Sequence, residues 1–477
     1  MAGRNDVRQL VVVGAGPGGY AAAFHAADLG INVTLIDPEE NPGGVCLYRG
    51  CIPTKALLHV AKVIAEAQKA KEWGVGLGEP QIDLKKLRAW KDGVVGKLTR
   101  GLGQLCKKRK VEYVRGEARF IDSHTLDIRR KRNGTEQISF EHAILAAGGR
   151  PVKIPGMPYE SSGVMDSTGA LELDNIPKSM LVIGGGYIGL ELGSIYARLG
   201  TKVSVVEMTP TLMPGSDQEL ISLLARRIKG LFESIMLETK VAELKEEENG
   251  LKAVFEGKDV EKKEKIYEKV LVAVGRRPNS SDIGLENTNI EIDEKGFVKV
   301  DQRRRTSDDS IYAIGDIAGP PQLAHKATHE GITAAKVIAG FDVVFEPKTI
   351  PFVIYTHPEI AACGLSEQQA REQNRNVKVV KFPWSASGRA AALGLDEGLT
   401  KLILDADSGQ VLGVGIVGSD AGELISEGAL AVEMAAVALD LAMTIHPHPT
   451  LSETLMESAA IFSGDCINLY RPKKPDS

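Results

Sequence analysis

The chain has 477 residues, a length at which a single hydrophobic core stops growing, so about two to four domains are expected. Hydrophobic residues at 43% and charged residues at 25% are ordinary proportions for a globular protein. A formal net charge of −5 argues against a surface that binds nucleic acid.

The first folding unit reads as strand, glycine turn, helix, strand and acid. An apolar strand is expected at residues 10–13, and a second strand, residues 32–36, ends at Asp37. Three glycines in the G-x-G-x-x-G spacing follow the first strand: Gly14, Gly16 and Gly19. The first permits a tight turn, the second lets a pyrophosphate approach, and the third allows close packing of helix on strand. Because Asp37 can accept ribose hydroxyls, the unit predicts a dinucleotide site.

Two cysteines five positions apart, Cys46 and Cys51, come after this unit. If the backbone between them coils into a helical turn, their Cα atoms can reach the roughly 4.4–6.8 Å that a disulfide needs. Such a bond closes only a short loop and restrains an unfolded chain little, so we expect it to serve redox chemistry. Helices are expected at residues 54–73 and 84–110, and a small antiparallel sheet at residues 111–128.

The pattern of strand, glycine turn, helix, strand and acid then recurs. Strands are expected at residues 180–183 and 202–206, with a helix at residues 190–199 between them, and Glu207 ends the unit. The turn again holds three glycines: Gly184, Gly186 and Gly189. A carboxylate at this strand end accepts hydrogen bonds from the 2′-hydroxyl of NAD and repels a 2′-phosphate. The second unit therefore favours NAD over NADP.

The rest of the chain holds a charged stretch at residues 243–265, which we expect to be exposed, and then mixed strands and helices. A strand is expected at residues 411–417 and an amphipathic helix at residues 422–440. The most apolar late stretch, residues 428–445, is interrupted by two acidic residues, which indicates a core helix and no membrane span.

A second reactive segment is His446-Pro447-His448-Pro449-Thr450-Leu451-Ser452-Glu453. Its prolines stiffen the loop and hold the neighbouring side chains in place. A histidine that a carboxylate holds in one tautomer is a common acid–base catalyst. The structural alternative is a rigid loop whose histidines bind nearby carbonyl groups.

Five cysteines are few for this length and odd in number, which is typical of a reducing compartment. The N-terminal residues hold neither an apolar signal core nor an arginine-rich transit segment, so a cytoplasmic protein is expected. No cysteine–histidine spacing matches a zinc site, and no metal is expected. The isolated cysteines are expected to be buried or incidental thiols: Cys106, Cys363 and Cys466.

The segment Cys46-x-x-x-x-Cys51-x-Pro53-x-Lys55 resembles the redox-active disulfide of the pyridine nucleotide–disulfide oxidoreductases. The segment that ends at Glu453 resembles that family's His-x-His-Pro-Thr-x-x-Glu motif. The resemblance implies an α/β fold with two Rossmann-like dinucleotide-binding domains and a C-terminal α+β dimerisation domain. It also implies four parts: an FAD-binding domain (residues 1–150), an NAD-binding domain (151–277), a central domain that completes the FAD site (278–350) and a dimer-interface domain (351–477).

The resemblance assigns roles to single residues. Cys46 is the sulfur that meets the substrate, and Cys51 is the one that faces the flavin. His448 is the acid–base, with Glu453 as its carboxylate, whereas the spacing of His446 does not match the motif. The remaining roles are a Lys55–Glu191 pair beside the flavin, further FAD contacts by Gly148, Asp316 and Ala324, and a further NAD contact by Gly275.

The resemblance is greatest to those family members that oxidise dihydrolipoyl groups with NAD⁺. It implies a homodimer, and a partner in the form of a lipoyl-bearing acyltransferase or carrier protein of a 2-oxo acid dehydrogenase or glycine cleavage system. The chain departs from the family at Tyr48-Arg49, and a cation between two cysteines is expected to favour their thiolates.

Two alternatives stay open. One is an NADH-dependent reductase for another disulfide. Glu207 argues against a glutathione reductase through its preference for NADH. The lone Cys466 argues against a mercuric reductase, which usually carries a vicinal cysteine pair near its C-terminus. The other is a flavoprotein that serves as an assembly scaffold and has lost catalysis.

Overall fold

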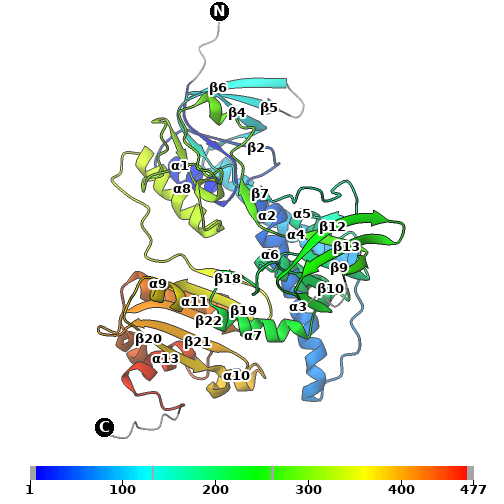
Figure 1. Cartoon of the computed structure of the whole chain (residues 1–477). Coiled ribbons are helices and arrows are strands. Elements are labelled where there is room, and N and C mark those ends of the chain that lie inside the picture. The colour runs from blue at the N-terminus through cyan, green and yellow to red at the C-terminus, as the bar shows by residue number, and fades with distance from the viewer. Residues whose placement is uncertain (1–6, 131–133, 259–262, 470–477) are drawn as a thin grey trace, which may run out of the picture.

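The computed structural model describes residues 7–130, 134–258 and 263–469. Three large sheets, each with its own helices, make up the molecule (Figure 1). None of the helices in these ranges combines the length and the apolar character that crossing a bilayer requires.

The first sheet has the order β3-β2-β1-β6-β5-β4, and β17 pairs with β6. Its central strand β1 is parallel to both β2 and β6, as the first glycine unit predicts. Helices α1 and α8 lie side by side on this sheet, because Gly331 lets α8 approach the backbone of Gly18. The elements are β1 (Arg8–Val13), α1 (Pro17–Asp28), β2 (Val33–Asp37), β3 (Glu112–Arg115), β4 (Glu117–Asp122), β5 (Thr125–Arg130), β6 (Gly134–Leu145), β17 (Ile311–Ala313), η3 (Gly315–Ala318) and α8 (Ala324–Ile338).

The antiparallel sheet predicted over residues 111–128 is only partly correct. Strands β4 and β5 are antiparallel, but β3 pairs with β2 in parallel register, with Thr34 opposite Glu112. Val114 on β3 is 3% exposed and packs into the core with Ile36. Alternating polarity in a four-residue strand does not reveal which strand is its neighbour or in which direction that neighbour runs.

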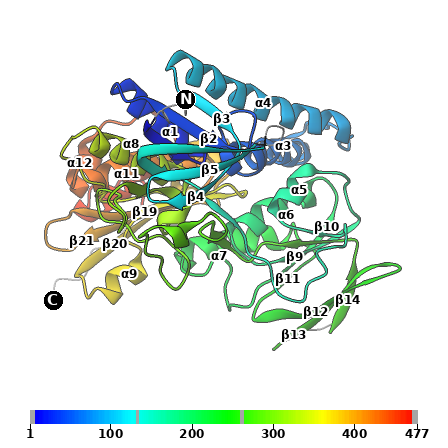
Figure 2. The same cartoon turned by 90° about the horizontal axis from the view of Figure 1, so that it is seen from above.

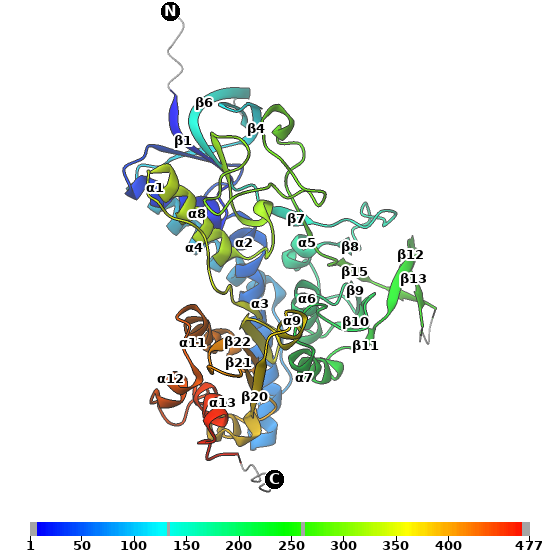
Figure 3. The same cartoon turned by 60° about the vertical axis from the view of Figure 1, so that its left-hand side comes forward.

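A layer of helices follows β2 in the chain. The apolar side chains of α3 at Leu57 and Ile64 pack against α6, so α3 runs between the second sheet unit and the C-terminal sheet (Figures 1 and 3). The predicted helices at residues 54–73 and 84–110 are present. The elements of this layer are α2 (Gly44–Arg49), α3 (Cys51–Lys69), η1 (Ala70–Trp73) and α4 (Leu84–Lys108).

The second sheet is parallel and has the order β11-β10-β9-β15-β8. The described parts of the charged stretch, residues 243–258 and 263–265, belong to a separate antiparallel sheet, β12-β13-β14, which projects at the edge of the molecule (Figure 2). Its inner face carries Leu251, Ala253 and Phe255, at most 4% exposed, so the predicted exposure holds only for the outer face. A short β7–β16 ladder joins the two connections between the sheets. The elements are β7 (Gly149–Pro151), β8 (Val164–Met165), α5 (Ser167–Glu172), β9 (Ser179–Ile183), α6 (Tyr187–Arg198), β10 (Lys202–Val206), α7 (Gln218–Lys229), β11 (Ser234–Met236), β12 (Thr239–Glu247), β13 (Gly250–Gly257), β14 (Glu264–Tyr267), β15 (Lys269–Val272), β16 (Arg276–Pro278) and η2 (Leu285–Asn287).

The C-terminal sheet is antiparallel, with the order β18-β19-β22-β21-β20, and Trp384 lies fully buried in its core. The single helix predicted over residues 422–440 is instead two helices, because Ala435 adopts a left-handed conformation with φ of 54°. The elements are β18 (Phe352–Ile354), β19 (Glu359–Gly364), α9 (Glu367–Glu372), β20 (Val377–Pro383), η4 (Trp384–Ala386), α10 (Gly388–Ala392), β21 (Leu399–Asp405), β22 (Val411–Gly418), α11 (Ala421–Glu433), α12 (Ala438–Met443) and α13 (Glu453–Ser463).

Candidate active site

A cavity of about 540 Å³ lies where the first glycine turn, the cysteine pair and the start of α6 meet. Its size is within the range of small-molecule and cofactor sites. Many of the residues that the sequence selects line it: Gly14, Gly16, Gly19, Asp37, Cys46, Cys51, Lys55, Gly148, Glu191, Asp316 and Ala324. Elements far apart in the sequence therefore converge on one site.

The first glycine turn leaves room for a ligand. Gly14 has φ of +98°, and a Cβ atom there would collide with the carbonyl oxygen of Ala146. A Cβ atom on Gly19 would collide with the carbonyl oxygen of Gly14. A Cβ atom on Gly16 would meet nothing within 4 Å, so the backbone is open toward the cavity. No side chain caps α1, and the amide groups of its first turn remain available to a phosphate.

Asp37 also shapes this turn. Its carboxylate accepts hydrogen bonds from the amides of Ala15 (2.7 Å) and Glu39 (2.9 Å). Burial raises the pKa of Asp37, and the hydrogen bond from Ala15 opposes that effect. The sequence assigned Asp37 only to the ribose and missed its bond to the glycine turn.

The second glycine turn repeats the geometry of the first. Cβ atoms on Gly184 and Gly189 would collide with carbonyl oxygens, whereas one on Gly186 would meet nothing within 4 Å. The carboxylate of Glu207 accepts hydrogen bonds from the amides of Gly185 (2.7 Å) and Thr209 (2.8 Å). Gly275, with φ of +123°, also faces open space. The two units are therefore equivalent in structure as well as in sequence.

The cysteines meet at the junction of α2 and α3. Both carry free thiols, and their sulfur atoms are hydrogen-bonded to each other. The hydrogen bond from Cys46 and the nearby ammonium of Lys55 lower the pKa of Cys51 to about 7, although burial opposes them. The same hydrogen bond, together with burial, raises the pKa of Cys46 well above its ordinary value. The two sulfurs are thus chemically different, and Cys51 is the one that ionises first.

Lys55 and Glu191 form an ion pair, with 2.9 Å between Lys55 Nζ and Glu191 Oε2. The Glu191 side chain is only 3% exposed, and its other oxygen accepts a hydrogen bond from the Tyr355 amide at 2.9 Å. Lys55 Nζ also lies 4.5 Å from the centre of the Tyr355 ring. Tyr355 was not predicted from the sequence, because nothing in its local pattern places β18 beside α6.

The Gly315–Asp316 turn also lines the cavity. Burial raises the pKa of Asp316, against the effect of Arg276, whose Nε lies 3.6 Å from the carboxylate. Nearby, the buried amide nitrogen of Gln322 lines the cavity and has no hydrogen-bond partner among the described residues. Such an orphaned donor indicates a missing ligand acceptor. Together with the open glycine turn and the Asp37 carboxylate, it fits FAD.

The histidine segment, residues 446–453, contributes no residue to the lining of the cavity. His448 Nδ1 lies 2.8 Å from Glu453 Oε1, and the other oxygen of Glu453 accepts the Thr450 amide at 2.7 Å. Although burial raises the pKa of Glu453, these hydrogen bonds lower it by more, so the pKa is below its ordinary value. The His448 side chain is 78% exposed, and its Nε2 faces solvent without a partner in the described ranges.

His446 is held differently from His448. Its Nε2 lies 2.9 Å from Glu427 and its Nδ1 lies 2.8 Å from the carbonyl oxygen of Thr444, and its side chain is 5% exposed. Both of its nitrogens are occupied, so its geometry matches the structural alternative. Only His448 presents a free nitrogen.

The single chain does not bring His448 to the cysteines, since it is absent from the cavity lining. Large apolar side chains on α11, on α12 and just after them are exposed close to it: Leu430, Met434, Leu439, Met443 and Ile445. Their exposed fractions run from 57% to 95%, and several large apolar side chains exposed in one part of the chain favour an interaction surface there.

Arg49 does not act as expected on the thiols. Its guanidinium pairs with Glu39, just after β2, and stacks 6.0 Å from the ring centre of Tyr48. The charge that lowers the pKa of Cys51 comes from Lys55. Arg49 is therefore directed toward Glu39, and the Tyr48 hydroxyl donates a hydrogen bond to the carbonyl oxygen of Asn41 at 3.0 Å.

The isolated cysteines are mostly enclosed. Cys106 and Cys363 are buried, and burial raises the pKa of both. Cys466 donates a hydrogen bond to Glu457 at 3.0 Å. In the described ranges, no three His, Cys, Asp or Glu side chains are grouped to hold a metal ion.

Comparison with known proteins gives two family matches. Residues 8–331 match the pyridine nucleotide-disulphide oxidoreductase family, and residues 350–459 match the dimerisation domain of that family. Two similar curated proteins are dihydrolipoyl dehydrogenases. The one from Haemophilus influenzae is 48% identical over 98% of this chain and 97% of the relative. The one from Vibrio cholerae is 46% identical over 98% of each chain.

Two solved structures share the fold at lower identity. LpdA from Mycobacterium tuberculosis has a TM-score of 0.88 and 25% identity, over 95% of this chain and 99% of that one. The HOCl-induced flavoprotein disulfide reductase RclA from Escherichia coli has a TM-score of 0.84 and 27% identity, with the same coverage. The chain therefore belongs to the pyridine nucleotide-disulphide oxidoreductase family and carries that family's dimerisation domain.

Proposed function

We propose that the protein is a dihydrolipoyl dehydrogenase, an FAD-containing enzyme that oxidises dihydrolipoamide to lipoamide with NAD⁺. One observation carries the proposal: a cysteine pair with unequal sulfurs lies in the same cavity as a glycine turn and acids that fit FAD. Relatives that are 42–48% identical over nearly their whole length carry this name, which favours dihydrolipoamide over another disulfide and over a catalytically inactive scaffold.

In this proposal FAD is held by the first glycine turn and Asp37, with Asp316, Gly148 and the start of α8 at Ala324. The second turn, with Glu207 and Gly275, takes NAD. The parts of the chain are then residues 1–150 for FAD, 151–277 for NAD, 278–350 for completion of the FAD site and 351–477 for the dimer interface. When bound, FAD supplies two-electron transfer between the cysteine pair and NAD⁺.

The protein's own residues carry out the sulfur chemistry. The structure has the reduced pair, and in the oxidised enzyme Cys46 and Cys51 form a disulfide. A thiolate of the substrate attacks Cys46 of this disulfide, and Cys51 leaves as a thiolate, which its pKa of about 7 favours. The second substrate thiol closes onto the first substrate sulfur, forms the lipoyl disulfide and expels Cys46. His448 accepts the substrate protons, and Glu453 orients it. The balance is dithiol plus NAD⁺ to disulfide plus NADH and H⁺.

The site is complete only in a homodimer, in which His448 of one chain serves the cysteines of the other. The exposure of His448 and of the apolar side chains around it supports this arrangement. The lipoyl group is proposed to arrive on an acyltransferase or carrier protein of a 2-oxo acid dehydrogenase or glycine cleavage system. The small number of cysteines agrees with a cytoplasmic location.

The test is the purified protein assayed with NAD⁺ and free dihydrolipoamide. The proposal expects a yellow protein with one FAD per chain, NADH formation, and loss of that activity in Cys46→Ser. A colourless protein, or a yellow one that forms no NADH from dihydrolipoamide but reduces another disulfide with NADH, would overturn it.

A further inference from the structure

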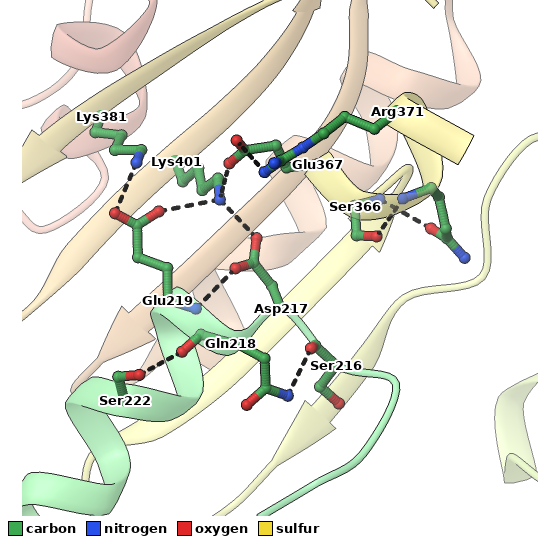
Figure 4. A network of polar contacts seen from close by, with 11 residues as sticks. Ser216, Asp217, Gln218, Glu219, Ser222, Ser366, Glu367, Arg371, Lys381 and Lys401 are labelled. Carbon is green, nitrogen blue, oxygen red and sulfur yellow. Dashed lines mark hydrogen bonds and ion pairs between the residues drawn. The ribbon is translucent and has the colours of Figure 1, made fainter. Parts of the chain in front are cut away.

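A buried charge cluster joins the second sheet unit to the C-terminal sheet (Figure 4). Lys401 on β21 is 1% exposed, and its Nζ lies 2.8 Å from Asp217, 3.0 Å from Glu219 and 2.7 Å from Glu367. Burial alone would lower the pKa of Lys401, but the three carboxylates raise it above its ordinary value. The lysine therefore remains charged in a place where an unpaired ammonium would be strongly unfavourable.

The three carboxylates come from two sides. Asp217 and Glu219 stand at the start of α7, in the second sheet unit, whereas Glu367 begins α9 beside the sheet of Lys401 itself. Two further ion pairs, Lys381–Glu219 and Arg371–Glu367, bring the cluster to three cations and three carboxylates. Within the cluster, only the bonds from Lys401 and Lys381 to the start of α7 cross between the units (Figure 4).

Helix α7 is packed closely on the C-terminal sheet at this point. A Cβ atom on Gly415 of β22 would come within 2.7 Å of the Leu220 side chain, which is 1% exposed. Asp217 uses one oxygen to cap α7, through the Glu219 amide at 3.0 Å, and the other to bind Lys401. The start of α7 is therefore fixed both by its own cap and by the neighbouring unit.

The same residues end the loop that follows Glu207. This loop, residues 208–216, is held near the second glycine turn by the Thr209 amide on Glu207 (2.8 Å) and the Met213 amide on the Gly185 carbonyl (3.1 Å). At its other end it is held by the Asp217–Lys401 ion pair. No member of the cluster lines the cavity of the cysteines.

We propose that Lys401, through Asp217, positions the loop after Glu207 for NAD binding, so that the C-terminal sheet determines the affinity of the NAD half-site. Lys401 and Asp217 are positioning residues, since neither belongs to the glycine turn that would contact NAD. This inference rests on the proposed function, because it assumes that the second turn takes NAD. Loss of the Asp217–Lys401 ion pair removes the contact that holds the loop where it joins α7, while Glu219 still binds Lys401, and it leaves the cysteine site unchanged.

The test compares Asp217→Asn with Glu367→Gln. Each removes one carboxylate from Lys401, but only the first acts across the units, and asparagine still caps a helix. Replacing Lys401 itself would leave three carboxylates facing one another. Asp217→Asn is expected to raise both the Kd and the KM for NAD⁺ at least about fivefold, which converts to about 1 kcal/mol. It should also speed amide hydrogen exchange in residues 208–216, and Glu367→Gln should change each quantity less than twofold.

Lys381→Met is the control for an exposed pair between the same units, because it breaks the Lys381–Glu219 pair but leaves all three carboxylates on Lys401, so it should change NAD⁺ affinity and loop exchange less than twofold. In all three variants, reduction of the bound flavin by dihydrolipoamide should keep the wild-type rate. Equal effects of Asp217→Asn and Glu367→Gln, or no effect of either on NAD⁺ affinity and loop exchange, would overturn the inference. A wild-type enzyme that reduces its flavin with dihydrolipoamide but does not bind NAD⁺ would instead contradict the proposed function.

Discussion

The ionisation of Cys51 responds to two opposite charges that the structure places beside it, Lys55 and Glu191. The hydrogen bond from Cys46 lowers the pKa of Cys51 and burial raises it; beside these effects the Lys55 ammonium lowers it and the Glu191 carboxylate raises it, and the result is about 7. A thiol at the ordinary value of 9.0 is about 1% ionised at pH 7, whereas one at about 7 is about half ionised.

Replacing each charged residue by a neutral one of similar shape should move this pKa in opposite directions. Lys55→Met removes the cation and should raise the pKa of Cys51 to about 8 or higher, since a charge a few ångströms away shifts a pKa by about 1–3 units. The thiolate fraction at pH 7 then falls from about half to about one tenth or less. Glu191→Gln should lower the pKa below 7, and glutamine keeps an oxygen for the Tyr355 amide.

The assay is the charge-transfer absorbance of the Cys51 thiolate against bound flavin, recorded from pH 5 to 10 after reduction with dithiol. In the wild type this band should gain intensity as the pH rises through about 7, because the thiolate forms above its pKa. Cys51→Ser should abolish the band. Midpoints that move in the same direction in Lys55→Met and Glu191→Gln, or that do not move, would refute the assignment of these charges.

Three further predictions concern other parts of the chain. NAD⁺ should be favoured over NADP⁺ by at least ~100-fold in kcat/KM, roughly 3 kcal/mol, with the margin reduced in Glu207→Gln; comparable wild-type rates would refute the role of that carboxylate. Arg49→Val should leave the midpoint of the thiolate titration unchanged, since the Arg49 guanidinium pairs with Glu39. A raised midpoint would show instead that Arg49 favours the cysteine thiolates, as expected from the sequence. Gly418→Ala should lower the free energy of unfolding by about 1–3 kcal/mol in a denaturant titration, because its methyl group would enter the ring of Trp384; unchanged stability would mean that this core adapts.

Much of the fold was accessible from local patterns in the sequence. Both glycine units form in order because their strand, turn, helix and acid are contiguous, so each turn depends only on nearby backbone. The errors arose where distant partners decide the outcome. Strand β3 joined β2 rather than β4, and the helix predicted at residues 422–440 broke at Ala435.

The candidate site shows the same division. The sequence selected Lys55 and Glu191 as a pair, and the structure brings them to 2.9 Å. It did not select Tyr355 or Gln322, because an ordinary strand residue and a loop amide become informative only when the tertiary fold places them at the cavity. For Arg49 the local pattern was misleading, since a nearer carboxylate attracts the cation.

The central claim is that dihydrolipoamide is oxidised at a site built by two chains, and activity in hybrid dimers tests it most directly. Cys51→Ser and His448→Ala are each expected to be inactive. In a hybrid, one site receives both defects, and the other receives intact cysteines from one chain and an intact histidine from the other. Isolated, verified hybrids should therefore reduce NAD⁺ with dihydrolipoamide at about half the wild-type rate per dimer. Hybrids as inactive as either parent would contradict the claim that His448 acts on the cysteines of the other chain.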